Sequence, residues 1–109
     1  MKAAFFDGLG QMQVMDYPDP KPLPEEAIVQ VKATGICGSD LLMNNDKTSP
    51  DEIPAGHEVA GEIVDIGSDV DSSYMGKRVA VEMIGHGRAC AQCWYCRFGQ
   101  YRQCTNLIP

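Results

Sequence analysis

Hydrophobic and polar residues alternate in several short stretches of this sequence, the pattern of strands with one buried face. Five stretches show it: residues 2–7, 11–16, 26–34, 57–67 and 76–81. The turn residues Gly8-Leu9-Gly10 separate the first two stretches and predict a hairpin, and Gly61 indicates a close backbone approach or a bulge. Many short strands with glycine-rich corners predict a mainly β fold, a small and strongly bent barrel.

Two segments interrupt the predicted strands. Residues 17–24 carry proline at every second position, which removes amide donors and predicts an extended surface connector. Residues 35–40 are rich in turn formers, and we expect the chain to continue from them as a short helix through Asn45. A loop is expected from Asn45 to Pro54, so helix content should be low.

Size and charge limit the possible functions. A chain of 109 residues with 44% hydrophobic residues fits one globular domain. Fifteen acidic against nine basic side chains give a net charge of −6, so the basic surface of a nucleic-acid binder is not expected. The apolar stretch at residues 1–7 is too short for a signal peptide or a membrane span. We therefore expect a cytoplasmic protein without a nucleic-acid or membrane partner.

Four cysteines near the end of the sequence follow the spacing C-x-x-C-x-x-C-x7-C. They are Cys90, Cys93, Cys96 and Cys104. Zinc(II) accepts four thiolates in a tetrahedron, and a two-residue gap lets a tight loop turn successive sulfurs toward one metal. The spacing therefore predicts a structural zinc lobe over residues 85–109.

Two disulfides or a redox pair are the competing interpretations of these cysteines. Disulfide geometry requires Cα atoms several ångströms apart with convergent Cβ vectors, which closely spaced cysteines reach with difficulty. The five cysteines of the chain also come without a secretory signal for an oxidising compartment. Both points favour the metal.

The lobe also combines basic and aromatic side chains. Its arginines are Arg88, Arg97 and Arg102, and its aromatic residues are Trp94, Tyr95, Phe98 and Tyr101. This combination is found in single-strand nucleic-acid binding. Arginines would equally balance the −2 charge of a tetrathiolate zinc centre, and the aromatic rings can pack against the lobe, another domain or another subunit. A free-standing zinc module that binds protein or nucleic acid is therefore the alternative function.

Cys37 lies outside the group of four, and its surroundings indicate a second metal site. It precedes Gly38-Ser39-Asp40 at a predicted helix start, where a thiolate pKa is lowered. His57 is the other soft metal ligand outside the lobe, and it begins a predicted strand. A thiolate and a neutral imidazole would make half of a catalytic zinc sphere.

Four motifs in this order resemble the catalytic domain of zinc-dependent medium-chain alcohol and polyol dehydrogenases. They are Gly35-Ile36-Cys37-Gly38-Ser39-Asp40, Gly56-His57-Glu58-Val59-Ala60-Gly61, Gly76-Lys77-Arg78-Val79 and the four-cysteine lobe. The resemblance covers essentially the whole chain. It implies a GroES-like, partly open β-barrel with a short helix and a structural zinc lobe.

The resemblance also implies a role for each matching residue. Cys37 and His57 would bind the catalytic zinc, and Glu58 would be the carboxylate that can approach the metal. Asp40 would accept a hydrogen bond from the free ring nitrogen of His57 and fix its tautomer. Ser39 would be the hydroxyl that takes the substrate proton. The structural zinc would be held by Cys90, Cys93, Cys96 and Cys104.

The chemistry implied is the oxidation of a small secondary alcohol or polyol, with zinc as Lewis acid and hydride transfer to NAD or NADP. A homo-oligomer, a dimer or a tetramer, is implied as well. Two positions depart from common patterns of the family. Leu42 replaces a histidine that often extends the proton relay, and Gly38 replaces a basic residue of the classical enzymes, which favours the polyol and threonine branches.

A cofactor-binding half is missing from the sequence. No G-x-G-x-x-G follows a predicted strand, and 109 residues cannot hold this barrel together with a dinucleotide-binding βαβ domain. A third protein ligand for the catalytic zinc is expected further downstream in this family. We therefore expect residues 1–109 to be the N-terminal part of a dehydrogenase, inactive alone, with the specific substrate and the choice between NAD and NADP left open.

Overall fold

The computed structural model describes residues 1–42, 54–82 and 89–107 of the chain. The strands are β1 (Lys2–Phe6), β2 (Met12–Asp16), β3 (Ala27–Thr34), β4 (Val59–Ile66) and β5 (Arg78–Val81). The helices are α1 (Gly38–Leu42) and α2 (Trp94–Arg97), with the 3₁₀ helices η2 (Ser72–Tyr74) and η3 (Tyr101–Gln103). The predicted strands and the low helix content are confirmed, whereas the predicted end of the helix and the loop at residues 45–53 lie outside the described residues.

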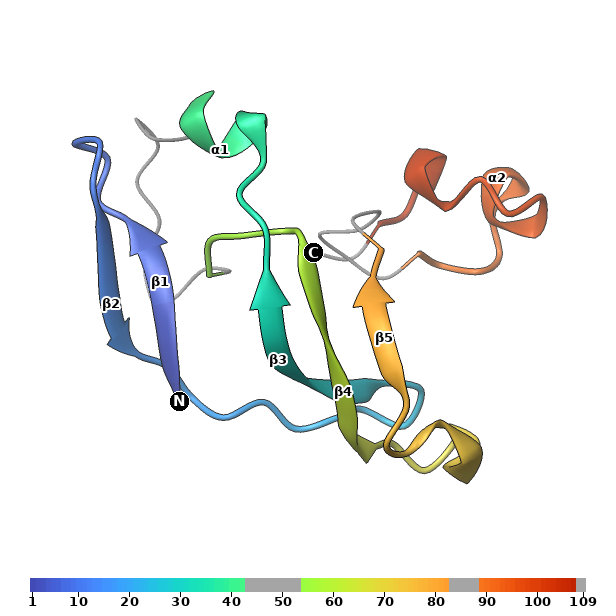
Figure 1. The fold of residues 1–109 in the computed structure, drawn as a ribbon. Helices are drawn as coiled ribbons and strands as arrows, with labels where there is room; N and C mark the ends of the chain where they lie inside the picture. The colour runs from blue at the N-terminus through green and yellow to red at the C-terminus, as the bar shows by residue number, and fades with distance from the viewer. Residues whose placement is uncertain (43–53, 83–88, 108–109) are drawn as a thin grey trace.

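The described strands form two separate antiparallel sheets. β1 pairs with β2 along its whole length, and β3, β4 and β5 form a three-stranded sheet in this order. The hairpin stands beside the larger sheet, α1 lies beyond the end of β3, and the segment with α2 extends beyond β5 (Figure 1). The fold is mainly β as expected, and the described strands do not close a barrel.

The β1–β2 hairpin forms where the sequence predicts it. The Oδ1 atom of Asp7 accepts hydrogen bonds from the backbone N–H groups of Leu9 (2.7 Å) and Gln11 (3.0 Å). Gly8 and Gly10 have φ values of 75° and 86°, which glycine reaches without strain. Phe5 and Phe6 at the end of β1 are buried, as is Ile63 in β4.

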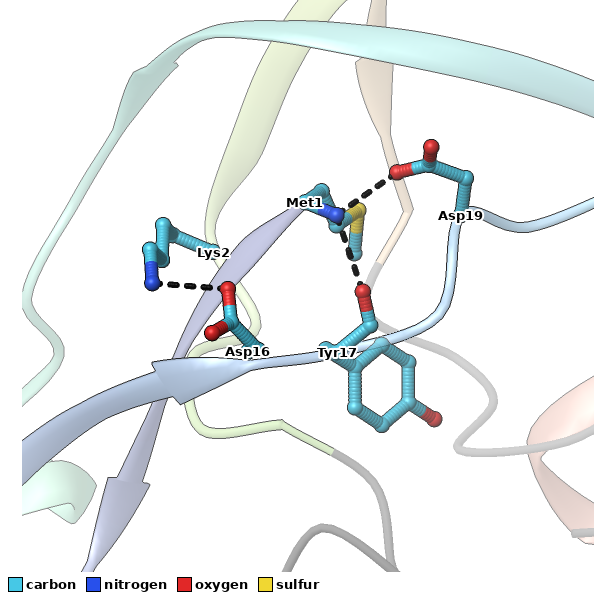
Figure 2. A network of polar contacts seen from close by, with 5 residues as sticks. All are labelled: Met1, Lys2, Asp16, Tyr17 and Asp19. Atoms are coloured by element: carbon cyan, nitrogen blue, oxygen red, sulfur yellow. Dashed lines mark hydrogen bonds and ion pairs between the residues drawn. The ribbon is translucent and has the colours of Figure 1, made fainter.

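Polar contacts at the first residue tie the hairpin to the proline-rich connector (Figure 2). The ammonium group of Met1 donates to the carbonyl oxygen of Tyr17 (2.9 Å) and to Oδ1 of Asp19 (2.7 Å). Lys2 and Asp16, a cross-strand pair, form an ion pair of 2.7 Å. Because these charged groups are exposed, each ion pair contributes at most about 1 kcal/mol, and only the contacts of Met1 reach the connector.

The β3–β4 ladder determines how the motifs at residues 35–40 and 56–61 come together. Its register shifts between Ile28 and Val29 and between Val31 and Ala33, so β3 carries two irregularities. Gly61 is buried against this strand, where a Cβ atom would lie 2.8 Å from Cγ1 of Val29. The close backbone approach predicted at Gly61 is therefore confirmed.

Candidate metal centres

The end of β3 and the start of β4 bring two distant motifs side by side. Thr34 pairs with Val59 at the last position of the ladder, and the N–H of Gly35 donates to the carbonyl oxygen of Glu58 (2.8 Å). Cys37 follows two residues later, immediately before α1, and His57 precedes Glu58. Residues twenty positions apart in the sequence thus reach one place because of the strand register.

Cys37, His57 and Glu58 form the first cluster of potential ligands. The Cys37 sulfur, a ring nitrogen of His57 and a carboxylate oxygen of Glu58 all lie within 4.8 Å of one another. Cys37 and His57 are half-buried, and Glu58 is exposed. The structure therefore brings together the three residues that the sequence resemblance placed at a catalytic zinc.

Asp40, in the first turn of α1, contacts both protein segments of this cluster. Its Oδ2 accepts a hydrogen bond from the backbone N–H of Cys37 (2.8 Å), and its own N–H donates to the Cys37 carbonyl (3.0 Å). Its Oδ1 lies 3.5 Å from Nδ1 of His57 and is buried without a hydrogen bond in the described part of the chain. A proton on Nδ1 of His57 would be favoured there, which leaves Nε2 available as a ligand.

Ser39 lies on the other side of the imidazole. Its hydroxyl oxygen is 3.4 Å from Nε2 of His57, and the side chain is exposed to solvent. Hydrogen bonds from the Ser39 side chain and backbone, and then from His57, lower the pKa of the Cys37 thiol. The contact with Cys37, followed by the charge of Asp40, raises the pKa of His57 despite partial desolvation.

This donor set fits a zinc ion. A thiolate, an imidazole nitrogen and a carboxylate oxygen are all common zinc ligands, and three protein ligands leave a position open for a substrate. The buried and unbonded Oδ1 of Asp40 is what an imidazole ligand needs as a partner. A divalent cation would stabilise the thiolate form of Cys37 and the neutral form of His57.

The second cluster contains the four cysteines of the lobe. The sulfur atoms of Cys90, Cys93, Cys96 and Cys104 lie within 4.8 Å of one another, and none of them forms a disulfide. A zinc–sulfur distance of about 2.3 Å in a tetrahedron requires sulfurs about 3.8 Å apart, so a small contraction suffices. The structure thus favours the metal interpretation over two disulfides.

Backbone N–H groups donate hydrogen bonds to sulfur atoms of the lobe, and such bonds favour the thiolate form that binds a cation. The N–H groups of Cys90 and Asn106 lie 3.4 Å from the Cys104 sulfur, and the N–H of Cys93 lies 3.3 Å from the Cys90 sulfur. Amides of Cys96 and Thr105 lower the pKa of the Cys93 thiol to about 6.

Cys96 behaves in the opposite way, since burial, followed by contacts with neighbouring sulfurs, raises the pKa of its thiol to about 12. Without a cation the cluster therefore holds a mixture of thiolates and thiols. A divalent ion would stabilise all four as thiolates.

The aromatic side chains of the lobe are largely exposed. Trp94 and Phe98 have exposed fractions of 70% and 63%, and their ring centroids are 4.6 Å apart. The two rings pack against each other at an angle of 50°. Arg97 and Arg102 are exposed, while Arg88 lies outside the described residues.

Two residues near the clusters were not expected from the sequence. Gly35 packs against the side chain of Glu58, and Ala91 has a φ of 56°, in the left-handed region that non-glycine residues rarely adopt. The glycine two residues before Cys37 could have indicated a close contact at position 35. The alanine at position 91 gave no indication of a left-handed backbone conformation.

Fold and geometry together define a mainly β domain with two cysteine-containing candidate metal centres. Among the described residues, no helix has the length and apolar composition required to cross a membrane. The profile of the alcohol dehydrogenase GroES-like domain matches residues 23–108, and the chain belongs to this family.

Individual relatives agree with this assignment. The chain is 42% identical over 93 residues to L-threonine 3-dehydrogenase of Pyrococcus horikoshii, covering 80% of this chain and 26% of that protein. It is 37% identical over 112 residues to sorbitol dehydrogenase of Bacillus subtilis, covering 98% of this chain and 31% of that protein. The crystal structure of CAD from Helicobacter pylori complexed with NADP(H) superposes with a TM-score of 0.80 at 26% identity, over 98% of this chain and 31% of that chain. The chain thus spans less than a third of the length of these relatives.

Proposed function

We propose that this chain is the metal-binding catalytic part of a zinc-dependent NAD(P) alcohol or polyol dehydrogenase. The observation that carries the proposal is the convergence of Cys37, His57 and Glu58 within 4.8 Å, beside Ser39 and Asp40. A zinc ion held there would act as a Lewis acid that favours loss of the proton from an alcohol. The four cysteines of the lobe would hold a second, structural zinc.

The neighbouring side chains would orient the ligands and transfer the substrate proton. Asp40 fixes the start of α1 through the Cys37 amide and faces Nδ1 of His57, so one carboxylate orients two ligands. Ser39 has an exposed hydroxyl beside the ligand atoms, and it would accept the substrate proton and pass it to solvent. Leu42 is 82% exposed and has no group that could extend this relay.

Substrate and cofactor follow from the relatives. The names of the relatives include a threonine and a sorbitol dehydrogenase, which supports a small secondary alcohol, polyol or amino alcohol as substrate. The sequence has no dinucleotide-binding motif, so NAD or NADP would be bound by another domain of a longer protein. We further propose a cytoplasmic homo-oligomer, a dimer or a tetramer, and residues 1–109 as one domain whose zinc lobe begins near residue 85.

Zinc stoichiometry with a competing chelator tests the metal assignment. The lobe, with four thiolates, should retain one zinc ion, and the site with three protein ligands should release its zinc much earlier. Cys37→Ser should abolish the weak site alone, whereas Ile36→Ala, a change at an 84% exposed neighbour, should not affect it. Two equally firm zinc ions, or a weak site that survives Cys37→Ser, would contradict the proposal.

The alternative, a free-standing zinc module, treats Cys37 and His57 as core residues. Their convergence with an exposed carboxylate is the observation against it. We expect no NAD(P)-dependent turnover from pure residues 1–109, because no cofactor-binding motif is present. Measurable hydride transfer by this chain would overturn the assignment of cofactor binding to another domain.

A further inference from the structure

The carboxylate of Glu58 lies across the bare Cα of Gly35. A Cβ atom on residue 35 would overlap Oε2 of Glu58 and would lie 3.2 Å from its Cβ and 3.3 Å from its Cδ. Gly35 is not among the residues with positive φ, so its backbone conformation is open to any amino acid. The glycine is therefore required by its neighbour rather than by its own dihedral angles.

Packing is what places this carboxylate. Glu58 is exposed, and its charge acts on Cys37 and His57, but no hydrogen bond from the other described residues holds its side chain. Its oxygen still lies within 4.8 Å of the potential ligand atoms of Cys37 and His57. The backbone contact from the Gly35 N–H to the Glu58 carbonyl (2.8 Å) fixes the distance between the two Cα atoms. The space left by the missing side chain is thus the space that the carboxylate uses.

We propose that Gly35 is a positioning residue for the Cys37–His57–Glu58 centre, because its missing side chain lets the Glu58 carboxylate reach the metal. This inference rests on the proposed metal-binding function. It adds that the glycine two residues before Cys37 serves the carboxylate of Glu58 rather than the cysteine. With a methyl group at residue 35, the carboxylate would swing toward solvent, and the centre would lose a ligand while the strands stay paired.

A double-mutant cycle between positions 35 and 58 separates this role from a structural one. The four proteins are the wild type, Gly35→Ala, Glu58→Ala and the double variant, each with zinc bound in the lobe. Cobalt(II) is titrated into the second site and followed by the absorption of its bond to the Cys37 thiolate. Unfolding by urea is measured on the same proteins without cobalt.

We expect Gly35→Ala to weaken cobalt binding about tenfold, nearly as much as Glu58→Ala, because both remove the same carboxylate from the site. In the Glu58→Ala background the second change should have little further effect. The urea midpoint should change little, since the overlapping atom is the free end of a flexible side chain. Gly38→Ala is the matched control, because a Cβ there meets no atom within 4 Å.

Three results would overturn the proposal. Equal cobalt affinity of Gly35→Ala and wild type would show that the carboxylate does not need the space. Additive losses in the double variant would assign Gly35 a backbone role, as would failure of Gly35→Ala to fold both with and without Glu58. Failure to fold only when Glu58 is present would support the contact. A cobalt signal that persists in Cys37→Ser would refute the metal centre itself, which is a separate result.

Discussion

Gly61→Ala offers the most direct test of how closely β3 and β4 approach. The Cβ of an alanine would lie 2.8 Å from Cγ1 of Val29 and 2.9 Å from the carbonyl carbon of Gln30, and it would overlap the Gln30 carbonyl oxygen. Real Cβ contacts are almost never this short. The clash at Gly61 includes main-chain atoms of a paired strand, so rotating a side chain cannot relieve it.

The expected cost follows from the nature of the clash. Overpacking a buried site costs typically about 1–3 kcal/mol, and occasionally more. Because β3 has to shift as a unit here, we expect a loss of about 3 kcal/mol, a large share of the roughly 5–15 kcal/mol of a typical domain. For a domain of about this size, that loss lowers Tm by roughly 15 °C.

Urea unfolding of the zinc-loaded protein, followed by far-ultraviolet circular dichroism, measures this loss. The midpoint should fall while the slope m stays constant, because the native state still buries the same surface. Gly38→Ala, with no atom near its Cβ, should be neutral or slightly stabilising at the start of α1. A free energy of unfolding of Gly61→Ala within about 0.5 kcal/mol of wild type would refute the close approach.

Two further predictions concern the backbone of the lobe and the turn before β5. Ala91→Gly should stabilise the lobe by up to about 1 kcal/mol, because the φ of 56° strains alanine. The gain should appear as slower loss of zinc to a chelator. Ala33→Gly is the control, because a glycine inside β3 should destabilise the fold instead. Backbone and side-chain hydrogen bonds from Ser73 lower the pKa of Asp71. The ionised carboxylate therefore stabilises the folded state above the unfolded pKa of 3.8, and this stabilisation is lost as the pH falls through the lower folded pKa. Asp71→Asn should therefore lower Tm at pH 7 by an amount that shrinks below about pH 4, and Glu25→Gln serves as the control variant. A difference in Tm between Asp71→Asn and wild type that stays constant with pH would contradict this prediction.

Local patterns in the sequence were sufficient for much of the fold. Alternation predicts strands such as β4, where Gly61 and Ile63, two positions apart, are both buried. Gly8 and Gly10 mark the hairpin turn, since both need a positive φ. Cysteine spacing predicts the lobe because three of its four ligands lie within seven residues, where the tight loop alone decides the geometry.

Other features depend on register and packing, which local patterns do not encode. The meeting of Cys37 with His57 requires Thr34 to pair with Val59, after two shifts in the β3 register. The residue types suggested Cys37 and His57 as ligands of one metal, and the resemblance to family motifs implied the same pairing, but neither gives the strand register that brings them together. The left-handed Ala91 has no sequence signal at all, because alanine is not a residue that favours this conformation.

The two candidate centres should therefore respond differently to damage in the sheet. The lobe takes its four potential ligands from residues 90–104, which follow β5, whereas the other centre depends on the β3–β4 ladder. Gly61 lies three residues after Glu58, so Gly61→Ala should displace the start of β4. Well below its Tm, this variant should bind cobalt more weakly at Cys37 and His57 and retain the lobe zinc as firmly as wild type. If both centres lost metal together, the lobe would depend on the sheet, and its independence as a local structure would be disproved.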